Sequence, residues 1–573
     1  MFKLTSYLSV LVLAACGGSE PPVPDAGQKA APEQAAKPSP QAFADVSDTC
    51  GVQFDQVAGL DGKWVLTEIM GGGGALFDMD GDADLDLLLL GGAVDSASPT
   101  SPPSGRGHGL FKNDGRGQFT DVSEGAGLDQ LVGYAMGTAS GDVNGDGHLD
   151  LYITQFGKNA LLLGNGRGGF SDVTEAWDAE VGGWSSSAAF VDVDADGDLD
   201  LFVARYIELN GKLECRDSTG RRTYCPPASG PALHDVLLRQ DDGRFVDISQ
   251  EVGLDAAARP GLGVVATDFS GDGRPDIYVT NDGSANQLWV QLEDGSWRDE
   301  ALQRGVALNH NGVAEASMGV VAEDLDGDGA VDLFMTHLQE ETHTLYGSRG
   351  GGLFRDRTSA AGLSRLTRPS TGFGVAAFDL ELDGDLDLAV AQGRVRVGPV
   401  WEGCELTGPF AQLAEPNLLL VNGGDGTFAG AEGRADALES PVMVDRCVLT
   451  GDLDGDGDVD LVITRNEGPV QVLRNDSPRE GAWILVDPRA DSASATALGV
   501  EVTVRSAERS ATRTSRASDG YQSSRDPRVH FGLPDRPDAV DVEVRWNSGE
   551  RERFPALQSN AVHRVVKGTG SAL

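Results

Sequence analysis

Residues 451–464, GDLDGDGDVDLVIT, combine a row of closely spaced carboxylates with an apolar, β-branched run. Nearly the same phrase occurs six more times upstream, with acidic or small polar residues at relative positions 1, 3, 5 and 9 of each copy. Apolar stretches such as GVVATD (263–268) lead into these loops, and stretches such as VDLVIT follow them, both typical of buried strands. Each copy therefore predicts a strand, an acidic turn and a second strand.

The acidic turns predict calcium sites. Ca²⁺ is a hard cation that prefers about six to eight oxygen ligands, and a tight loop can supply carboxylates together with the backbone carbonyl of position 7. Without a cation, so many like charges in nine residues would repel one another. Up to seven Ca²⁺ ions are therefore expected. The candidate ligands, loop by loop, are Asp78, Asp80, Asp82, Asp84 and Asp86; Asp142, Asn144, Asp146, His148 and Asp150; Asp192, Asp194, Asp196, Asp198 and Asp200; Asp268, Ser270, Asp272, Arg274 and Asp276; Asp324, Asp326, Asp328, Ala330 and Asp332; Asp379, Glu381, Asp383, Asp385 and Asp387; and Asp452, Asp454, Asp456, Asp458 and Asp460.

The loops differ from EF-hands, because an apolar residue such as Ile463 stands where an EF-hand has its bidentate Glu, and because strands flank them. Glycine at positions 4 and 6 permits the positive φ angles of a tight loop. Three loops depart from the pattern and are expected to be weaker sites. The first has Ala83 at position 6, the fourth has Ser270 at position 3, and the sixth has Glu381 followed by Leu382.

The spacing of the loops predicts a closed ring. Their first acids lie 50 to 76 residues apart, a period typical of propellers and solenoids. The second half of each unit, as in LFKNDGRGQFTDVSEGAGL (110–128), adds a glycine turn between two more strands. Four strands per unit predict an all-β, seven-bladed β-propeller. The last unit lacks the GxFxDV element, and FADVS (43–47) is predicted to supply that strand and close the ring.

The remaining segments have different compositions. Residues 1–16 predict a lipoprotein signal peptide whose lipobox, Leu13-Ala14-Ala15-Cys16, ends in a lipidated cysteine, and hence an outer-membrane or surface location. Residues 17–42 are rich in Pro and Ala and predict a flexible tether. The propeller is expected at 43–481, and alternating strands at 482–573 predict a separate small β-domain.

The net charge limits the possible partners of the protein, and the cysteines suggest disulfide bonds. The formal charge of −44 argues against nucleic acid as a partner, although 26 of the 89 acidic residues occupy loop positions 1, 3, 5 and 9. An exported compartment permits disulfides. Cys215 and Cys225 bracket a short loop and are predicted to pair. Cys404–Cys447 is a second possible pair, with Cys50 an equally allowed partner.

Taken together, these motifs resemble a known family. The repeats are similar to the FG-GAP/VCBS repeats of integrin α propellers, and ALGVEVTVRS…SDGYQSSRDPRVHFGLPD…VDVEVRW resembles an ASPIC/UnbV domain. Their combination resembles the cartilage-acidic-protein family, which has bacterial secreted members. Supporting stretches are DIYVTNDGSANQLW (276–289) and the ECRDSTGRRTYCPP insertion (214–227). The resemblance implies the propeller fold and calcium binding, but no defined biochemical activity.

No enzymatic motif was found. Neither GxSxG nor a phosphate-binding GxxxxGK[ST] occurs, and Ser523, Ser524, Asp526 and His530 are interpreted as a structural turn rather than a catalytic triad. We therefore expect a non-catalytic, calcium-binding, membrane-anchored surface scaffold that binds a protein or glycan. Two alternatives are a polysaccharide lyase or hydrolase with acids in the insertions, and an envelope assembly or maturation factor.

Overall fold

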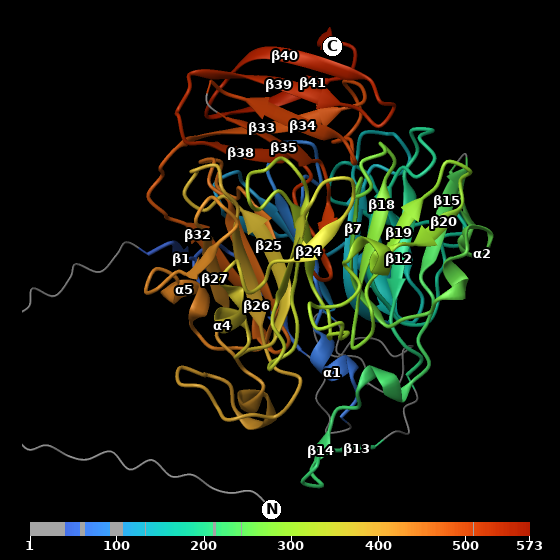
Figure 1. Ribbon diagram of the computed structural model, residues 1–573, viewed down its shortest axis with the longest axis vertical. Helices are drawn as coiled ribbons and strands as arrows, with labels where there is room; N and C mark the ends of the chain where they lie inside the picture. The colour runs from blue at the N-terminus through green and yellow to red at the C-terminus, as the bar shows by residue number, and fades with distance from the viewer. Residues whose placement is uncertain are drawn as a thin grey trace, which may run out of the picture. The chain divides into compact units, whose positions relative to one another are not determined.

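The chain folds into seven blade-like sheets and two further sheets that form a C-terminal β-domain (Figure 1). In this computed structural model the predicted signal peptide, its Cys16 and most of the tether lie outside the described residues. The residues described are 41–57, 64–91, 107–131, 133–209, 214–241, 243–507 and 509–573.

Each blade is an antiparallel sheet of four strands, and the strand named first here is the innermost. The first three blades comprise β3 (Gly74–Phe77), β4 (Asp86–Leu90), β5 (His108–Asn113) and β6 (Phe119–Asp121); β7 (Tyr134–Gly141), β8 (Asp150–Phe156), β9 (Ala160–Gly164) and β10 (Phe170–Asp172); and β11 (Ser185–Val191), β12 (Asp200–Arg205), β15 (Val236–Asp241) and β16 (Arg244–Asp247).

The next three blades keep the same order along the chain. They comprise β17 (Gly261–Thr267), β18 (Asp276–Asn281), β19 (Gln287–Gln291) and β20 (Trp297–Asp299); β21 (Val320–Glu323), β22 (Asp332–Met335), β23 (Thr344–Ser348) and β24 (Phe354–Asp356); and β25 (Gly372–Phe378), β26 (Asp387–Gln392), β27 (Leu418–Asn422) and β28 (Phe428–Gly430).

The seventh blade closes the ring with a strand from the start of the folded chain. It contains β29 (Asp445–Gly451), β30 (Asp460–Arg465), β32 (Gln471–Asn475) and β1 (Phe43–Asp45), with Phe43 opposite Asn475. The predicted closure by FADVS is therefore confirmed. Each innermost strand contacts the next, and β29 contacts β3, so the ring is complete. The fold begins slightly earlier than the tether was predicted to end, because Ala42 is fully buried and Gln41 Nε2 donates to Asp436 Oδ2 (3.0 Å).

Blade strands are apolar on both faces because each blade packs between two others. On β4, Leu87 and Leu89 pack with residues of the seventh blade such as Leu449, whereas Leu88 and Leu90 pack with residues of the second. Alternate side chains of a strand point to opposite faces, so a continuous leucine run serves both neighbours. This explains why the strands after the loops lack polar alternation.

Helices are few and short in the described chain, and none is long and apolar enough to cross a membrane. The helices are α1 (Thr67–Met70), α2 (Ser249–Val252), α3 (Ala301–Arg304), α4 (Leu363–Thr367) and α5 (Asp436–Glu439), with 3₁₀ turns η1 (Leu128–Gln130), η2 (Pro227–Ser229), η3 (Leu254–Ala256) and η4 (Gly408–Gln412).

One more two-stranded pair, β2 (Asp55–Gln56) with β31 (Gly468–Pro469), lies beside the seventh blade.

One predicted disulfide is present and the other is wrong. Cys215 and Cys225 are bonded across the hairpin of β13 (Cys215–Arg216) and β14 (Arg222–Thr223). Cys404, Cys447 and Cys50 are free. Cys447 is fully buried with Cys50 in the core between the first and seventh blades, whereas Cys404 packs against a different apolar cluster, in the insertion before β27. The two predicted partners therefore pack in different apolar clusters and are not bonded.

The C-terminal β-domain is a pair of sheets with its own apolar core. Alternate residues of β33 and β34, such as Ile484 and Val502, meet in that core with Phe531. One sheet contains β33 (Ala482–Arg489), β38 (Val529–Leu533) and β41 (Ala561–Val566), and the other contains β34 (Glu501–Arg505), β35 (Ser510–Thr514), β39 (Ala539–Arg545), β40 (Arg551–Gln558) and β42 (Ser571–Ala572).

One segment of this domain enters the propeller, and we call residues 516–526 the plug. Its strands β36 (Ser518–Asp519) and β37 (Ser523–Ser524) extend the first blade, where β37 runs parallel to β3. Tyr521, at the tip, is fully buried; its ring packs edge-on against Phe373 of β25 (5.2 Å between centroids). The plug contacts innermost strands all around the ring, so it fills the propeller axis.

Candidate metal centre

The acidic loops fold around their own carboxylates. In the seventh loop, Asp452 at position 1 accepts hydrogen bonds from the backbone N–H groups of Gly455 (2.8 Å) and Gly457 (2.9 Å). Asp456 at position 5 accepts one from the N–H of Asp458 (3.0 Å). In all seven loops the residue at position 5 receives this bond from position 7. The acidic residues therefore stabilise the turn by hydrogen bonds to its own backbone, and their spacing in the sequence places them to do so.

The aspartate at position 9 joins the loop to the rest of its blade. Asp460 Oδ2 accepts from the N–H of Leu453 (2.9 Å), and its Oδ1 accepts from the N–H of Asn475 on the neighbouring β32 (2.7 Å). Equivalent pairs of bonds occur in every blade, and all seven of these aspartates are buried. This position therefore fixes the loop to two strands, in addition to any role as a ligand.

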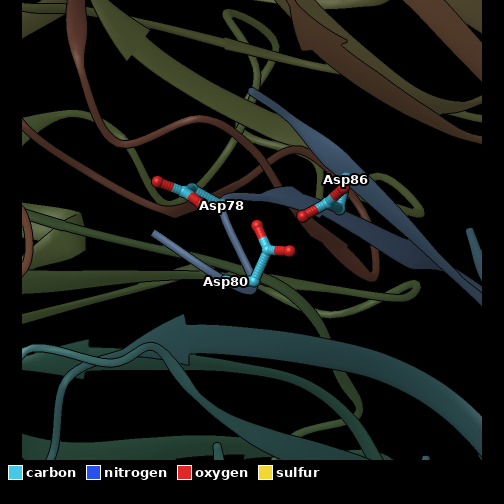
Figure 2. A group of neighbouring side chains, drawn as sticks. All are labelled: Asp78, Asp80 and Asp86. Carbon is cyan, nitrogen blue, oxygen red and sulfur yellow. The ribbon is translucent and has the colours of Figure 1, made fainter. Parts of the chain in front are cut away.

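Four loops bring three carboxylates together. The gathered residues are those at positions 1, 3 and 9, and one carboxylate oxygen from each lies within 4.8 Å of the others. Figure 2 shows the first loop, where the carboxylates of Asp80 and Asp86 point toward each other and that of Asp78 is turned to the side. The other three groups are Asp192, Asp194 and Asp200; Asp324, Asp326 and Asp332; and Asp452, Asp454 and Asp460.

Each of these four groups contains a buried carboxylate oxygen that has no hydrogen-bond donor among the described residues. In three of the groups it belongs to the position 3 residue, and in the remaining one to position 1. A buried oxygen without a partner is costly, and a bound cation would satisfy it. These oxygens are Asp80 Oδ1, Asp192 Oδ1, Asp326 Oδ1 and Asp454 Oδ1. The four groups could therefore hold metal ions.

The electrostatics of the loops favour the binding of a cation. Burial, reinforced by the neighbouring acids, raises the pKa of Asp86, Asp200 and Asp332 to about 7, although backbone N–H groups partly offset the shift. Burial also raises the pKa of Asp460 well above its ordinary range. Burial and like charges both disfavour the ionised carboxylates, and a nearby cation would favour them.

Basic side chains lie on two of the groups. Lys112 forms a close ion pair with Asp80, and Arg357 forms one with Asp326. Lys112 is 39% exposed and Arg357 19%, and each contacts the Oδ2 atom of the aspartate at position 3. Neither contact satisfies the buried Oδ1 of its aspartate.

The other three loops arrange their side chains differently. The second and fourth have Asn144 and Ser270 at position 3, so each offers one carboxylate fewer. In the sixth loop Glu381 lies 3.7 Å from Arg434, and positions 1, 3 and 9 do not form a group of the kind seen in the other four. The first loop, predicted to be weak, does assemble its acids. Ala83 there adopts φ 77°, and Leu382 in the sixth loop adopts φ 62°, so the backbone keeps the loop conformation without glycine.

Positions 5 and 7 lie outside the four groups. Asp456 and Asp458 both bond Arg479 (2.7 and 2.8 Å), and Asp385 pairs with Arg509 of the C-terminal domain. Position 7 also holds His148, Arg274 and Ala330 in other loops, which share no side-chain chemistry. A role of position 7 that is common to all seven loops would therefore rest on its carbonyl, although Asp458 Oδ1 is also buried without a hydrogen-bond donor among the described residues.

The C-terminal domain covers the ends of the innermost strands where the loops lie, which we call the loop face (Figure 1). His530 Nε2 lies 2.9 Å from the carbonyl oxygen of Gly457, and Arg528 donates to the carbonyl of Ala83 (3.1 Å). The backbone N–H of Ala495 donates to Asp142 Oδ2 (3.3 Å). The domain thus contacts loops from several blades at once.

The residues considered as a triad do not assemble. Ser524 Oγ bonds Ser140 Oγ (2.8 Å) inside the propeller, whereas Asp526 pairs with Arg528 (2.9 Å) and His530 faces Gly457. The structural interpretation of this segment agrees with its position in the plug. It was nevertheless expected to be only a turn, and its insertion into the ring was not predicted.

Small residues recur at one position of every repeat, close to the plug. The residue five positions before the first acid of every loop is small, and three of these positions face the plug directly: a Cβ on Gly73, Gly137 or Gly263 would lie within about 3 Å of plug atoms. At Ser187 the hydroxyl accepts a hydrogen bond from the N–H of Gln522 (3.2 Å). This recurring register was a signal in the sequence for an occupied axis. The seven residues are Gly73, Gly137, Ser187, Gly263, Gly319, Gly374 and Cys447.

Family models match the two kinds of domain. The model described as ASPIC and UnbV matches residues 490–572. The model described as FG-GAP-like repeat matches residues 142–203, 268–335 and 324–390. The chain contains FG-GAP repeats and a C-terminal ASPIC/UnbV domain. The predicted family resemblance is therefore confirmed, and the plug is part of the ASPIC/UnbV domain.

Relatives of this FG-GAP and ASPIC/UnbV protein include cartilage acidic protein 1. The Xenopus tropicalis protein is 24% identical over 435 residues and the Mus musculus protein 25% over 438, each covering 73% of this chain. The chain spans 62% of the length of these curated relatives. Among solved structures, a rhamnogalacturonan lyase matches with a TM-score of 0.37 at 14% identity, covering 76% of each chain, a likeness that carries no argument about function.

Proposed function

We propose that this protein is a non-catalytic, calcium-stabilised scaffold that binds a protein or glycan partner. The observation that carries the proposal is the set of four carboxylate groups, each with a buried oxygen that has no donor within the described chain. In each group the residues at positions 1, 3 and 9 would hold the ion. The ion would supply the positive charge that the folded loops lack.

Calcium fits these loops better than the other common cations. The side-chain donors in the four groups are all carboxylate oxygens, which disfavours the softer metals that bind Cys and His. Mg²⁺ demands near-octahedral geometry and keeps several waters, whereas Ca²⁺ accepts irregular sets of carboxylate and carbonyl ligands. Loops in which the residue at position 7 varies, as it does here, suit the more tolerant ion.

The scaffold would present the face opposite the C-terminal domain to a partner. The loop face is covered by that domain, and the axis is filled by the plug. The opposite face carries the disulfide hairpin β13–β14 and the insertion at residues 393–414, both of which interrupt the repeat. Since insertions placed on a rigid frame commonly carry binding residues, this face is the proposed contact surface.

We place the protein outside the cytoplasm, held to a membrane by a lipid on Cys16. The lipobox sequence and the Cys215–Cys225 disulfide support this location. Metabolic labelling with a palmitate analogue would test it. Incorporation that is lost in Cys16→Ala supports the proposal, and labelling that persists in the variant contradicts it.

Thermal unfolding with and without calcium tests the scaffold proposal. Extracellular calcium modules bind with Kd of about 10⁻⁴–10⁻³ M, so millimolar calcium should stabilise the fold by about 1–2 kcal/mol per site. The Tm should rise when CaCl₂ at about 2 mM, above the Kd expected of such sites, replaces EDTA. MgCl₂ at the same concentration should raise the Tm much less. Identical melting in both buffers would contradict calcium stabilisation. Turnover of a polysaccharide would favour the alternative that the protein is a lyase or hydrolase. Recovery of envelope assembly components in a calcium-independent complex would favour the alternative that it is an assembly or maturation factor.

A further inference from the structure

A cavity of about 800 Å³ lies at the end of the propeller opposite the loop face. Its position follows from its lining, because Leu262, Met318 and Phe373 stand at or before the beginnings of innermost strands whose far ends carry the acidic loops. The sides are formed by α1, by the hairpin β13–β14 and by the insertion before β27, segments that Figure 1 shows below the blades. The volume is within the range of about 300–1,000 Å³ that is usual for small-molecule sites.

The floor of the cavity is apolar and aromatic. Ile69, Met70, Leu262, Met318 and Phe373 belong to one buried cluster, which Tyr521 of the plug joins from above. The hydroxyl of Tyr521 donates to the carbonyl of Met70 (3.3 Å), so the plug closes the axis behind the floor. A ligand rich in hydroxyl groups would lose hydrogen bonds to water on such a floor, whereas an apolar body would gain from burial.

One wall carries a pair of aromatic rings. Trp64 and Tyr224 are tilted against each other with centroids 5.1 Å apart, and Tyr224 directly precedes the disulfide cysteine Cys225. The disulfide restrains the hairpin and hence the place of this wall before any ligand arrives, which lowers the entropic cost of binding.

Arginines stand at the cavity in an otherwise strongly acidic protein. Arg222 is paired with Glu214 (3.4 Å), but Arg221 and Arg396 form no salt bridge with any carboxylate of the described residues. The two arginines belong to different insertions, one to the hairpin and one to residues 393–414. Both side chains are exposed at the cavity. Their guanidinium groups, from separate segments, provide donors for a carboxylate, which a guanidinium can bind through two parallel hydrogen bonds.

The cavity also contains acidic residues. The hydroxyl of Tyr206 donates to Asp282 Oδ2 (2.6 Å), so one oxygen of this carboxylate is already occupied. Asp217 accepts hydrogen bonds within its own turn, from the N–H groups of Thr219 and Arg221. Both acids are thus hydrogen-bonded within the protein, and each also interacts electrostatically with one of the arginines, Asp282 with Arg396 and Asp217 with Arg221.

We propose that this cavity binds a small organic anion, with an apolar, ring-sized body on the floor and a carboxylate at Arg221 and Arg396. The proposal goes beyond the scaffold function and does not depend on calcium in the loops. It assigns a ligand site to the face opposite the loop face, which we call the insertion face, within the cavity between the same insertions that are proposed to contact a macromolecular partner.

Three ligands with the same body and different charges test the proposal on the full chain in calcium buffer. They are 2-naphthoate, 2-naphthamide and 2-naphthylmethylammonium, and binding is measured by calorimetry. Because a hydrogen bond to a charged group is worth about 1.5–3 kcal/mol, naphthoate should bind about 10- to 100-fold more tightly than the amide. The ammonium should bind most weakly. Equal binding of the acid and the amide, or preference for the ammonium, would overturn the anion proposal.

Substitutions test whether Arg221 and Arg396 are the residues that bind the carboxylate. Arg396→Gln and Arg221→Gln should each reduce the preference for naphthoate over naphthamide, and the double variant should abolish it. Arg349→Gln is the matched control, since Arg349 is an exposed hairpin arginine away from the cavity. Asp282→Asn should tighten naphthoate by removing a like charge. Unchanged naphthoate affinity in the double variant, with an unchanged Tm, would contradict the site.

A saccharide arm separates this proposal from glycan binding at the same place. Digalacturonate carries carboxylates but a hydroxylated body, so it should bind at least about tenfold more weakly than naphthoate if the apolar floor decides affinity. Tighter binding of digalacturonate, competitive with naphthoate, would overturn the apolar part of the proposal.

Discussion

The two faces of the propeller are built from different kinds of sequence. The loop face consists of seven copies of one acidic turn, and the ASPIC/UnbV domain covers it. The opposite face has no repeated element; its hairpin, its insertion and α1 surround a cavity. The comparison indicates that repetition constructs the frame and its acidic loops, whereas departures from the repeat create a surface on which selective binding can occur.

The largest expected difference concerns the loop face without metal. Burial raises the pKa of Asp86, Asp200 and Asp332 to about 7 in the fold, well above the value of an aspartate in an unfolded chain. A raised pKa means that the folded state binds protons more tightly, so stability is retained below pH 4 and lost as pH rises through 7. In EDTA, Tm should therefore fall by about 10 °C between pH 5 and pH 8.

Calcium should weaken or reverse this trend, because it replaces the proton as the counter-charge. Melting curves at several pH values, in EDTA and in calcium, measure both effects. A metal-free protein that is more stable at pH 8 than at pH 5 would show that these carboxylates are not the groups that control the loop face.

The next effect concerns the plug, which connects the two faces through the axis. Tyr521→Ala removes a fully buried ring that packs against Phe373, and should lower the free energy of unfolding by about 3–5 kcal/mol. Leu302→Ala, at a side chain that is 71% exposed, is the control and should change little. Denaturant titration measures both, and a plug variant as stable as the control would mean that the axis contributes nothing to folding.

A smaller effect distinguishes positions within one loop. Asp454 belongs to the carboxylate group and has a buried oxygen without a donor, whereas Asp456 lies outside the group and pairs with Arg479. Asp454→Asn should remove about 1–2 kcal/mol of calcium-dependent stability and leave the EDTA value nearly unchanged. Asp456→Asn should keep most of the calcium response, and an equal loss in both variants would place position 5 inside the site.

The smallest effect on global stability is expected at the insertion face. The Cys215–Cys225 bond closes a short hairpin that lies outside the blades. The double variant with serine at both positions should shift Tm by only about 1–2 °C, because the blades unfold independently of that hairpin. Binding of naphthoate should weaken, since Tyr224 would no longer be held in the wall. A large loss of Tm would show that the insertion belongs to the structural frame.

Much of the propeller could be predicted because the same weak sequence pattern occurs seven times. A single acidic turn is ambiguous, but seven with one spacing predict the blades, and the missing outer strand of the last unit predicts closure by Phe43–Asp45. Position 9 was expected only as a ligand. Its role in bonding the neighbouring strand, as Asp460 does with Asn475, depends on tertiary contacts that a spacing cannot reveal.

The plug and the cavity were not predicted, because both join segments that are far apart in the sequence. Tyr521 meets Met70 and Phe373 only once the ring has closed. The small residue five places before each loop was visible in the sequence, but its meaning depends on knowing that these positions face the axis. The failed Cys404–Cys447 pair has the same cause: parity of cysteines gives no information about distance.

The most direct test of the account is the number of calcium ions bound per chain. Protein dialysed against calcium and then analysed for bound metal should retain four ions, one for each group of positions 1, 3 and 9. The second, fourth and sixth loops would raise the number toward seven if their carbonyls compensate for the altered side chains. A chain that is fully folded and holds no divalent ion in millimolar calcium would contradict the central claim.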